Sequence, residues 1–254
     1  MILKLMTYNI LNGGEGREQS ILEVIQSVQP DIIILQEVYK ATFLQNLGKA
    51  LNMQPFFGSS NRKRRVALLS RLPIRSVSSH HPSFPIWNNV IEAEIEYRAN
   101  RTLKVFGIHA KANLGVAWEW RRWQEAKYIL KQTNPYSDKP CLIAGDFNAI
   151  APYDAVVTSR MPNWLKLTLR LQGNRIYRFS IRAYLKAGFT DSFRYLNDRE
   201  DGFTLPPPNP NSRLDYIMVN SLLKQCLKKC WVVREPSIVK KASDHYPVIA
   251  EFEL

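Results

Sequence analysis

The sequence predicts an α/β fold, and three observations support that prediction. Short apolar runs alternate along the chain with longer segments whose apolar residues recur at helical spacing. Several of the short runs are apolar without interruption, which is typical of strands that are covered on both faces. Nothing resembling a linker divides the 254 residues, so we expect a single domain over 1–254 with a sizeable core.

The first part of the chain predicts two strand–helix pairs. In order, the expected elements are a strand over 2–8, a helix over 20–29, a strand over 32–35 and a helix over 42–51. The first helix ends at Pro30, because proline is not accommodated in a helix interior. Each of the two strands leads into a polar side chain, Asn9 after the first and Glu37 after the second.

The middle of the chain predicts four further strands and one long helix. The strands are expected over 66–70, 90–97, 101–108 and 141–144, and the helix over 117–132. A basic cluster, 61–65, precedes the first of these strands, and the second and third form a probable hairpin. His80-His81 falls in a Ser- and Pro-rich segment, where we expect solvated surface rather than a metal site. The helix carries Trp118, Trp120 and Trp123; core packing explains one or two of them, and the rest could form a stacking platform.

The last third of the chain combines a basic segment with two more strands. After a Pro- and Asn-rich loop over 203–212, strands are expected over 213–219 and 248–252. Before them, 160–186 holds seven basic residues, no Asp or Glu, and interleaved aromatic side chains. This composition suits a phosphate backbone with bases that can stack. A solvated pair of amphipathic helices explains it equally well.

The charge of the chain is informative about its partners. The formal net charge is +13 at pH 7, which favours a polyanion such as nucleic acid, or an anionic membrane surface. It carries no information about the fold.

The cysteines and the N-terminus bear on the compartment. An odd number of cysteines, three, does not suggest a disulfide framework. Cys226 and Cys230 could share a helix face, but no second pair of metal-type ligands accompanies them. We interpret all three cysteines as structural and the compartment as reducing. The apolar start is too short for a signal peptide and no run is long enough to span a membrane, so we expect a cytoplasmic protein.

Polar residues collect at the ends of the predicted strands, and their types suit phosphoryl chemistry. They are Asn9, Glu37, His109, Asp146, Asn148, Asp215, Asp244 and His245. Binding crevices of layered α/β folds lie at strand ends, so these side chains can converge. Hydrolysis of a phosphodiester needs a hard cation on the phosphate oxygens, an activated water and a proton for the leaving oxygen. Carboxylates such as Glu37 are suitable ligands for Mg²⁺.

Over essentially its whole length the sequence resembles the endonuclease/exonuclease/phosphatase superfamily. Each matching motif is weak alone, but their order and separations also match. The motifs are Thr7-Tyr8-Asn9, Pro30-Asp31 through Leu35-Gln36-Glu37-Val38, Leu68-Leu69-Ser70-Arg71-Leu72-Pro73-Ile74, Val105-Phe106-Gly107-Ile108-His109, Arg122-Trp123-Gln124, Gly145-Asp146-Phe147-Asn148, Arg213-Leu214-Asp215-Tyr216-Ile217 and Ser243-Asp244-His245-Tyr246-Pro247-Val248. The resemblance implies a four-layered α/β-sandwich, with two packed central mixed sheets and helices outside.

The resemblance also implies a metal environment. Glu37 would be the principal ligand, and Asn9 and Asp244 would complete the environment directly or through water. The implied cation is Mg²⁺, with Mn²⁺ as an alternative.

The same resemblance assigns catalytic roles to five residues. Asp146 would orient or deprotonate the attacking water, and Asn148 would hold the scissile phosphate. His245 would contact a phosphate oxygen and share charge with Asp215, and His109 would assist the leaving group. Whether Asp146 or His245 is the base stays open.

Two features bear on substrate choice. His109 stands where deoxyribonuclease-like and lipid- or inositol-phosphatase-like members have histidine and AP endonucleases usually have tyrosine, so AP-site specificity is in doubt. The basic and aromatic insert at about 151–190 lies outside the core motifs, and we expect Arg170, Arg175 and Arg178 to bind substrate.

Three functions follow from these observations. The leading hypothesis is a Mg²⁺-dependent phosphodiesterase that acts on DNA or RNA. The alternative is a phosphatase or phosphodiesterase for phosphoinositides or phospholipids, since basic clusters bind those headgroups too. A non-catalytic binding module is disfavoured, because Glu37, Asp146, Asp244 and His245 are all present. The sequence does not predict an oligomeric state.

Overall fold

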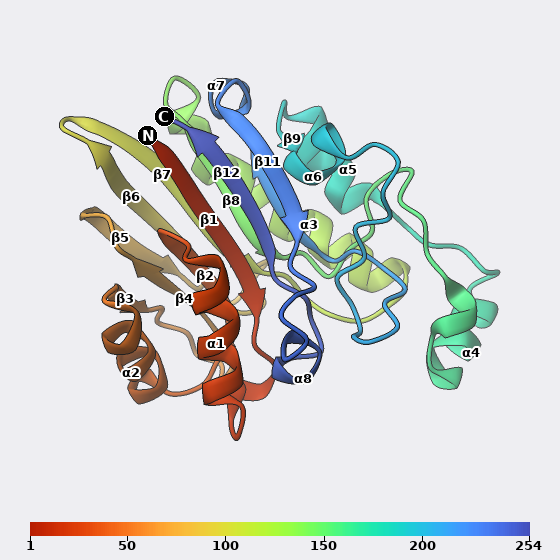
Figure 1. The fold of residues 1–254 in the computed structure, drawn as a ribbon. Helices are drawn as coiled ribbons and strands as arrows, with labels where there is room; N and C mark the ends of the chain where they lie inside the picture. Colours follow the sequence, from red (N-terminus) through yellow and green to blue (C-terminus); the bar gives the residue numbers. More distant parts are fainter.

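Two six-stranded sheets lie face to face in the computed structural model, which describes residues 1–254 (Figure 1). From edge to edge, the first sheet contains β11 (Leu227–Val232), β12 (Val248–Glu253), β1 (Ile2–Asn9), β2 (Ile32–Val38), β4 (Arg65–Ser70) and β3 (Gln54–Phe57). The second contains β5 (Ile74–His80), β6 (Val90–Arg98), β7 (Arg101–His109), β8 (Cys141–Asp146), β10 (Asp215–Val219) and β9 (Thr190–Asp191). Only β1–β2 and β7–β8 pair in parallel, so both sheets are mixed.

Helices cover the outer face of each sheet, which completes the four layers. On the first sheet lie α1 (Glu18–Val28), α2 (Ala41–Leu51) and α8 (Val239–Ala242), and on the second α3 (Val116–Thr133) and α5 (Phe179–Lys186). The remaining helices are α4 (Asn163–Leu171), α6 (Ser192–Leu196) and α7 (Ser221–Lys224), with 3-10 turns at Asn12–Gly14, Asn134–Tyr136 and Thr158–Arg160. The predicted α/β-sandwich is confirmed. None of the helices combines the length and apolar character that crossing a bilayer requires.

Successive side chains of the strands point to opposite faces of the sheets, and this divides the apolar core into separate layers. In β1, Leu3 and Leu5 face the second sheet and join the apolar cluster between the sheets. Met6 and Tyr8 point the other way and pack with Ile21 of α1. Because successive side chains of a strand point to opposite faces, a strand covered on both sides must be apolar throughout. This explains the uninterrupted apolar runs of the sequence.

The strands that the sequence analysis did not predict are the four outermost strands of the two sheets. They are β3, β5, β9 and β11. Two expectations need correction, the first for His80 only, since His81 is exposed as expected. His80 is the last residue of β5, and its Nε2 lies 2.9 Å from Glu92 Oε2, so it is not part of a solvated loop. Cys230 lies buried in β11, so it shares no helix face with Cys226; all three cysteines are free thiols.

The insert is joined to the second sheet by a buried ion-pair cluster around Arg213, two residues before β10. Its guanidinium donates to both carboxylate oxygens of Asp191, at 2.9 and 2.6 Å, and to Asp154 Oδ2 at 2.9 Å. All three side chains are buried. Within the insert α5 packs against α3, whereas α4 lies apart from the sheets (Figure 1).

We expect Arg213→Met to lower the free energy of unfolding by about 3–5 kcal/mol, because the carboxylate of Asp191 would stay buried without a cation and Asp154 would keep only its contact with Arg194. Urea unfolding measures the change. The control is Lys228→Met, which removes an exposed ion pair with Glu253 and should change little. Equal effects of the two substitutions would contradict a stabilising role for the buried cluster.

Candidate active site

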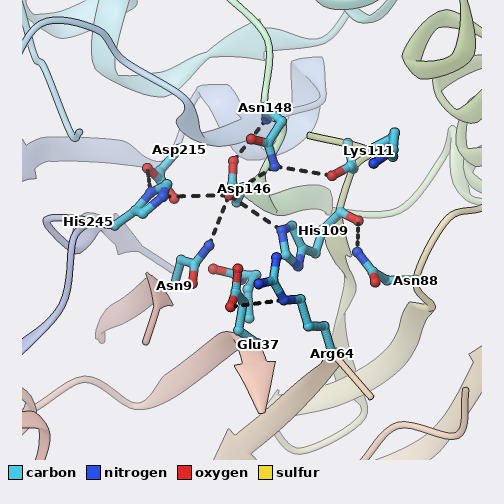
Figure 2. A network of polar contacts seen from close by, with 12 residues as sticks. Asn9, Glu37, Arg64, Asn88, His109, Lys111, Asp146, Asn148, Asp215 and His245 are labelled. Atoms are coloured by element: carbon cyan, nitrogen blue, oxygen red, sulfur yellow. Dashed lines mark hydrogen bonds and ion pairs between the residues drawn. The ribbon is translucent and has the colours of Figure 1, made fainter. Parts of the chain in front are cut away.

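The strand-end residues of both sheets meet at one edge of the sandwich (Figure 2). Asn9, His109 and Asp146 end β1, β7 and β8, and Glu37 is the penultimate residue of β2. Antiparallel β10 begins at this edge with Asp215, and Asp244-His245 precede β12. Strand register places His109 and Asp215 on either side of Asp146. The predicted convergence of these residues is therefore a property of the fold.

Asp146 lies at the centre of the site and is almost completely buried. Its Oδ2 accepts hydrogen bonds from Asn9 Nδ2 at 3.0 Å and from Asn148 Nδ2 at 3.1 Å, and its Oδ1 accepts from the backbone N–H of Asn148 at 2.9 Å. Gly145 permits this close packing, because a Cβ there would stand 2.0 Å from the carbonyl oxygen of Ile108. The carboxylate is thus fixed in orientation by both sheets.

The side-chain amide of Asn148 donates both of its hydrogen bonds to groups within the site. Besides its bond to Asp146, its Nδ2 donates to the carbonyl oxygen of Ala110 at 3.1 Å. A contact between this amide and a phosphate, as the resemblance implies, requires one of the two bonds to open. In the present geometry Asn148 positions Asp146.

His245 lies between two carboxylates. Its Nδ1 is 2.8 Å from Asp215 Oδ2, and its Nε2 is 3.8 Å from Asp146 Oδ2. Burial opposes a charged imidazole, but the negative charges of Asp215 and Asp146 outweigh it and raise the pKa of His245 to about 10. Burial, assisted by the charge of Asp215, raises the pKa of Asp146 to about 7. The geometry therefore favours an imidazolium at His245 beside a less readily ionised Asp146.

His109 lies on the other side of Asp146 and is held in a different state. Its Nε2 is 3.6 Å from Asp146 Oδ2, too far for a hydrogen bond, and its buried Nδ1 has no partner. Asn88 donates to its backbone carbonyl at 2.9 Å. Burial, with the positive charges of His245 and Arg64, lowers the pKa of His109 to about 3. This histidine is therefore neutral at physiological pH.

Glu37 lies opposite this group, where β2 is irregular. It adopts φ 64°, and the register with β4 shifts between Leu35 and Val38. Its Oε2 accepts from the backbone N–H of Asn12 at 2.8 Å and lies 3.3 Å from Nε of Arg64. Arg64 also donates to Asn12 Oδ1 at 3.1 Å. The irregular end of β2 thus directs the Glu37 carboxylate toward the guanidinium of Arg64.

Asp244 completes the set predicted for a metal. It is half-buried, and burial together with the charge of Glu37 raises its pKa, against the opposing effect of His245. Asn9 Oδ1 accepts from the backbone N–H of Leu11 at 3.1 Å, which leaves one lone pair available. Two carboxylates and an amide oxygen are hard donors that suit Mg²⁺ or Mn²⁺. The guanidinium against Glu37 marks a place where a cation is accommodated, so the residues fit a divalent metal.

A second group of candidate metal ligands is Asp146, Asp215 and His245, whose ligand atoms all lie within 4.8 Å of one another. His245 and Asp215 are already hydrogen bonded. Asp215 Oδ1 is buried without a partner. We interpret this trio as a hydrogen-bonded catalytic group, and the Glu37 side as the metal side.

The three arginines predicted to bind substrate are not brought into this group. Arg170 and Arg175 are exposed, on α4 and in the loop after it, and neither forms an ion pair. Arg178 is half-buried, and its Nη1 donates to the carbonyl oxygens of Ala151 and Asp154 at 2.6 and 2.9 Å. These bonds engage Arg178 in holding the start of the insert, which conflicts with a free role in substrate binding.

Several residues at the site were not singled out from the sequence. Arg64 belongs to the basic cluster 61–65, which was noted without a role. Asn88 supports His109, and Glu125 of α3 accepts from the backbone N–H groups of Trp87 and Lys111 at 2.8 and 3.0 Å. Arg122, in the motif Arg122-Trp123-Gln124, donates to the carbonyl oxygens of Lys111 and Asn113. No spacing rule in the sequence connects these distant positions.

The family comparison decides the classification. A model of the endonuclease/exonuclease/phosphatase family matches residues 6–245. The chain belongs to this family. It is accordingly a hydrolase of phosphoric ester bonds.

Individual members of the family align over almost the whole chain. Exodeoxyribonuclease III of Haemophilus influenzae is 25% identical over 279 residues, covering 99% of this chain and all of the relative. An AP endonuclease from Archaeoglobus fulgidus has a TM-score of 0.78 at 20% identity, covering 99% of this chain and 100% of that one. The 3′ phosphatase NExo from Neisseria, bound to product DNA hairpin, has a TM-score of 0.76 at 21% identity over the same shares. These structural likenesses support the shared fold.

We expect Arg64→Met to tighten binding of Mn²⁺ to the metal side several-fold, because it removes a cation that competes for Glu37 Oε2. Titration of the protein with Mn²⁺, followed by electron paramagnetic resonance without substrate, measures the dissociation constant. Arg65→Met is the matched control, since Arg65 lies over the ring of Phe57 instead. Unchanged or weaker Mn²⁺ binding in Arg64→Met would place the metal elsewhere.

Proposed function

We propose that this member of the family is a Mg²⁺-dependent nuclease that hydrolyses phosphodiester bonds of DNA or RNA. The observation that carries the proposal is the buried Asp146, which lies between His109 and the His245–Asp215 pair and opposite Glu37. Two of the similar proteins are described as an exodeoxyribonuclease and as a phosphatase bound to a DNA hairpin. The net charge of +13 supports a polyanionic substrate.

Glu37, Asp244 and Asn9 would hold the divalent cation. When bound, the cation would neutralise charge on the phosphate oxygens and orient the phosphate. Glu37 would give up its contact with Arg64 and contact the divalent cation instead. The hydrogen bond that it accepts from the backbone N–H of Asn12 would keep the carboxylate in place.

The protein's own residues then divide the proton transfers. His245, flanked by the carboxylates of Asp215 and Asp146, is held as a cation and would donate to a phosphate oxygen. A cationic imidazole cannot accept a proton, so Asp146 would receive the proton of the attacking water. His109, neutral in its buried position, would donate a hydrogen bond to the leaving oxygen, which would take up the proton that Asp146 received from the water. This division assigns the base role to Asp146 rather than to His245.

A lipid or inositol phosphate substrate is the second candidate, and α4 supports it. Trp164, Leu167 and Leu171 of this helix are 65%, 56% and 80% exposed. An amphipathic helix with an exposed apolar side and basic neighbours suits an anionic membrane surface. The strand-end site would be the same in both cases.

We expect Mg²⁺-dependent hydrolysis of nucleic acid that EDTA abolishes and that His245→Ala loses by at least about 100-fold, the scale of general acid–base catalysis. The substrates are supercoiled plasmid, single-stranded DNA, RNA and a fluorescent phosphoinositide, each with Mg²⁺, Mn²⁺ or EDTA. His245→Ala, purified in parallel, controls for contaminating nuclease. Turnover of the phosphoinositide without cleavage of nucleic acid would overturn the proposed substrate.

We expect Asp146→Ala to remove turnover while leaving binding of nucleic acid largely intact, because Asp146 acts on the water rather than on the phosphate backbone. Single-turnover cleavage and fluorescence anisotropy of a labelled strand measure the two properties. Near-normal cleavage would discard the proposed catalytic group.

For the insert, replacing Arg170 and Arg175 together should weaken binding and flatten its salt dependence, since each lost phosphate contact reduces the slope by roughly 0.7–0.9. Anisotropy titrations over a range of salt concentrations test this. Arg178 is left unchanged, because it holds backbone carbonyls. An unchanged slope would show that the exposed side of the insert is a solvated surface.

A further inference from the structure

Beside the site, cations and aromatic rings form an interleaved surface. We call it the cationic–aromatic surface and define it by Arg62, Phe84, Trp87, Lys111, Trp118 and Arg121. Arg62 lies 3.9 Å from the centroid of the Trp87 ring, and Lys111 lies 4.1 Å from the same ring and 4.7 Å from Trp118. Arg121 lies 4.7 Å from Phe84 and 5.6 Å from Trp87. The surface therefore joins four chain segments.

This surface is continuous with the strand-end site. In three of its chain segments, one residue lies in the strand-end site and a residue one or two positions away lies on the cationic–aromatic surface. These pairs are Arg64 and Arg62, Asn88 and Trp87, and His109 and Lys111. Figure 2 shows Arg64, Asn88, His109 and Lys111 around Asp146. A substrate whose phosphate reaches Asp146 therefore has its adjoining part within reach of these side chains.

The cations of this surface lack anionic partners. Arg62, Lys111 and Arg121 form no ion pair, and the Arg62 guanidinium and Lys111 ammonium donate no hydrogen bond to another residue. Burial, together with the positive charges of Arg62, Arg64 and Arg121, lowers the pKa of Lys111, against the opposing effect of the Glu125 carboxylate. An anion at this point would relieve the repulsion. The surface thus offers unfilled donors to a phosphate.

Rings are also available for stacking. Phe84 and Trp118 are 53% and 38% exposed, and the neighbouring Trp120 is 47% exposed. A hollow of about 240 Å³ is lined in part by Arg62, Trp87 and Asn88. Bases inside a duplex have their faces covered, so only unpaired bases can stack on such rings.

The support beneath the surface is rigid. The buried Glu125 carboxylate binds the backbone N–H groups of both Trp87 and Lys111, and Arg122 holds the carbonyl oxygen of Lys111. Arg122 is itself paired with Glu119 at 2.9 Å in the interior. Two segments far apart in the sequence are thus fixed to α3, which lowers the ordering cost of binding.

We propose that the cationic–aromatic surface is a subsite for unpaired nucleotides next to the scissile bond, with phosphates on Arg62 and Lys111 and a base stacked on Trp118. The proposal rests on the proposed function in one respect, because it takes the substrate to be nucleic acid. A bilayer fits this surface less well, since its rings carry cations rather than forming an apolar face, whereas α4 has such a face.

The test measures binding of a fluorescein-labelled single strand of about 12 nucleotides, a length that one such surface can cover, to the full chain in EDTA, so that no cleavage occurs. Trp118→Ala should weaken binding roughly 5- to 100-fold, the range expected for loss of a stacked base. It should leave unchanged the weaker binding of a strand of the same length built from abasic nucleotides. Trp118→Phe should retain most of the affinity, because phenylalanine keeps a ring on which a base can stack. Trp164→Ala, on α4, is the matched control and should bind like the wild type.

Two further measurements separate the subsite from the catalytic proposal. Replacing Arg62 and Lys111 with Met should lower the salt slope by about 1.4, or roughly 0.7 for each single-strand phosphate contact. Hydrolysis of bis(p-nitrophenyl) phosphate, which has no nucleobase, should be equal in wild type and Trp118→Ala. If the wild type hydrolyses no phosphodiester but shows the base-dependent binding, the proposed function fails and the subsite stands.

Three outcomes would overturn the subsite. The first is that Trp118→Ala and the wild type bind the single strand equally. The second is that the wild type binds the normal and abasic strands equally. The third is that Trp118→Ala loses binding to phosphatidylserine vesicles but keeps its binding to the strand. The third outcome would assign the surface to lipid.

Discussion

The hydrogen bond from Asn9 to Asp146 joins the two sheets at the point where the chemistry takes place. Asn9 ends β1 of one sheet and Asp146 ends β8 of the other, 137 residues later, and the two side chains meet at 3.0 Å. The His245–Asp215 pair makes a second connection of the same kind, from the segment before β12 to the start of β10. The site therefore exists only while the sheets are packed in their present register. Any change in the apolar layer between them would displace one half of the site from the other.

This arrangement buries charged side chains, which is unfavourable in free energy. The surrounding structure offsets that cost with hydrogen bonds and ion pairs. Asp146 receives three hydrogen bonds, and His245 is placed between two carboxylates. The same principle supports the periphery, where Arg213 and Arg194 pair with Asp154 and Asp191, and Arg122 pairs with Glu119. Breaking a buried pair costs far more than removing an exposed one. These clusters therefore hold the insert and α3 in fixed positions relative to the strand ends.

The sequence predicted the inner strands and the main helices, because both depend on local pattern, and the polar residues at the strand ends do lie together in the structure. Ile32 to Leu35 must be apolar to lie between layers, and Glu37 stands out at the end of such a run. The edge strands were missed, since an edge strand has neighbours on one side only; β5 reads Ile-Arg-Ser-Val-Ser-Ser-His and is mostly half-exposed or exposed. The pairing of Arg64 with Glu37 and of Arg178 with backbone carbonyls could not be predicted, because these contacts depend on where separate loops meet.

The basic residues of this protein lie in at least two different environments, and the net charge of the chain does not distinguish between them. On α4 and the loop after it, Arg170 and Arg175 lie near exposed apolar side chains and away from the strand ends. On the cationic–aromatic surface, Arg62 and Lys111 share one indole ring beside His109. A polyanion is attracted by the sum of these charges, but it is oriented only where donors, rings and a reactive group lie together. The contribution of a basic residue to specificity is therefore set by its distance from Asp146 and by its neighbours, and the sequence composition contains neither quantity.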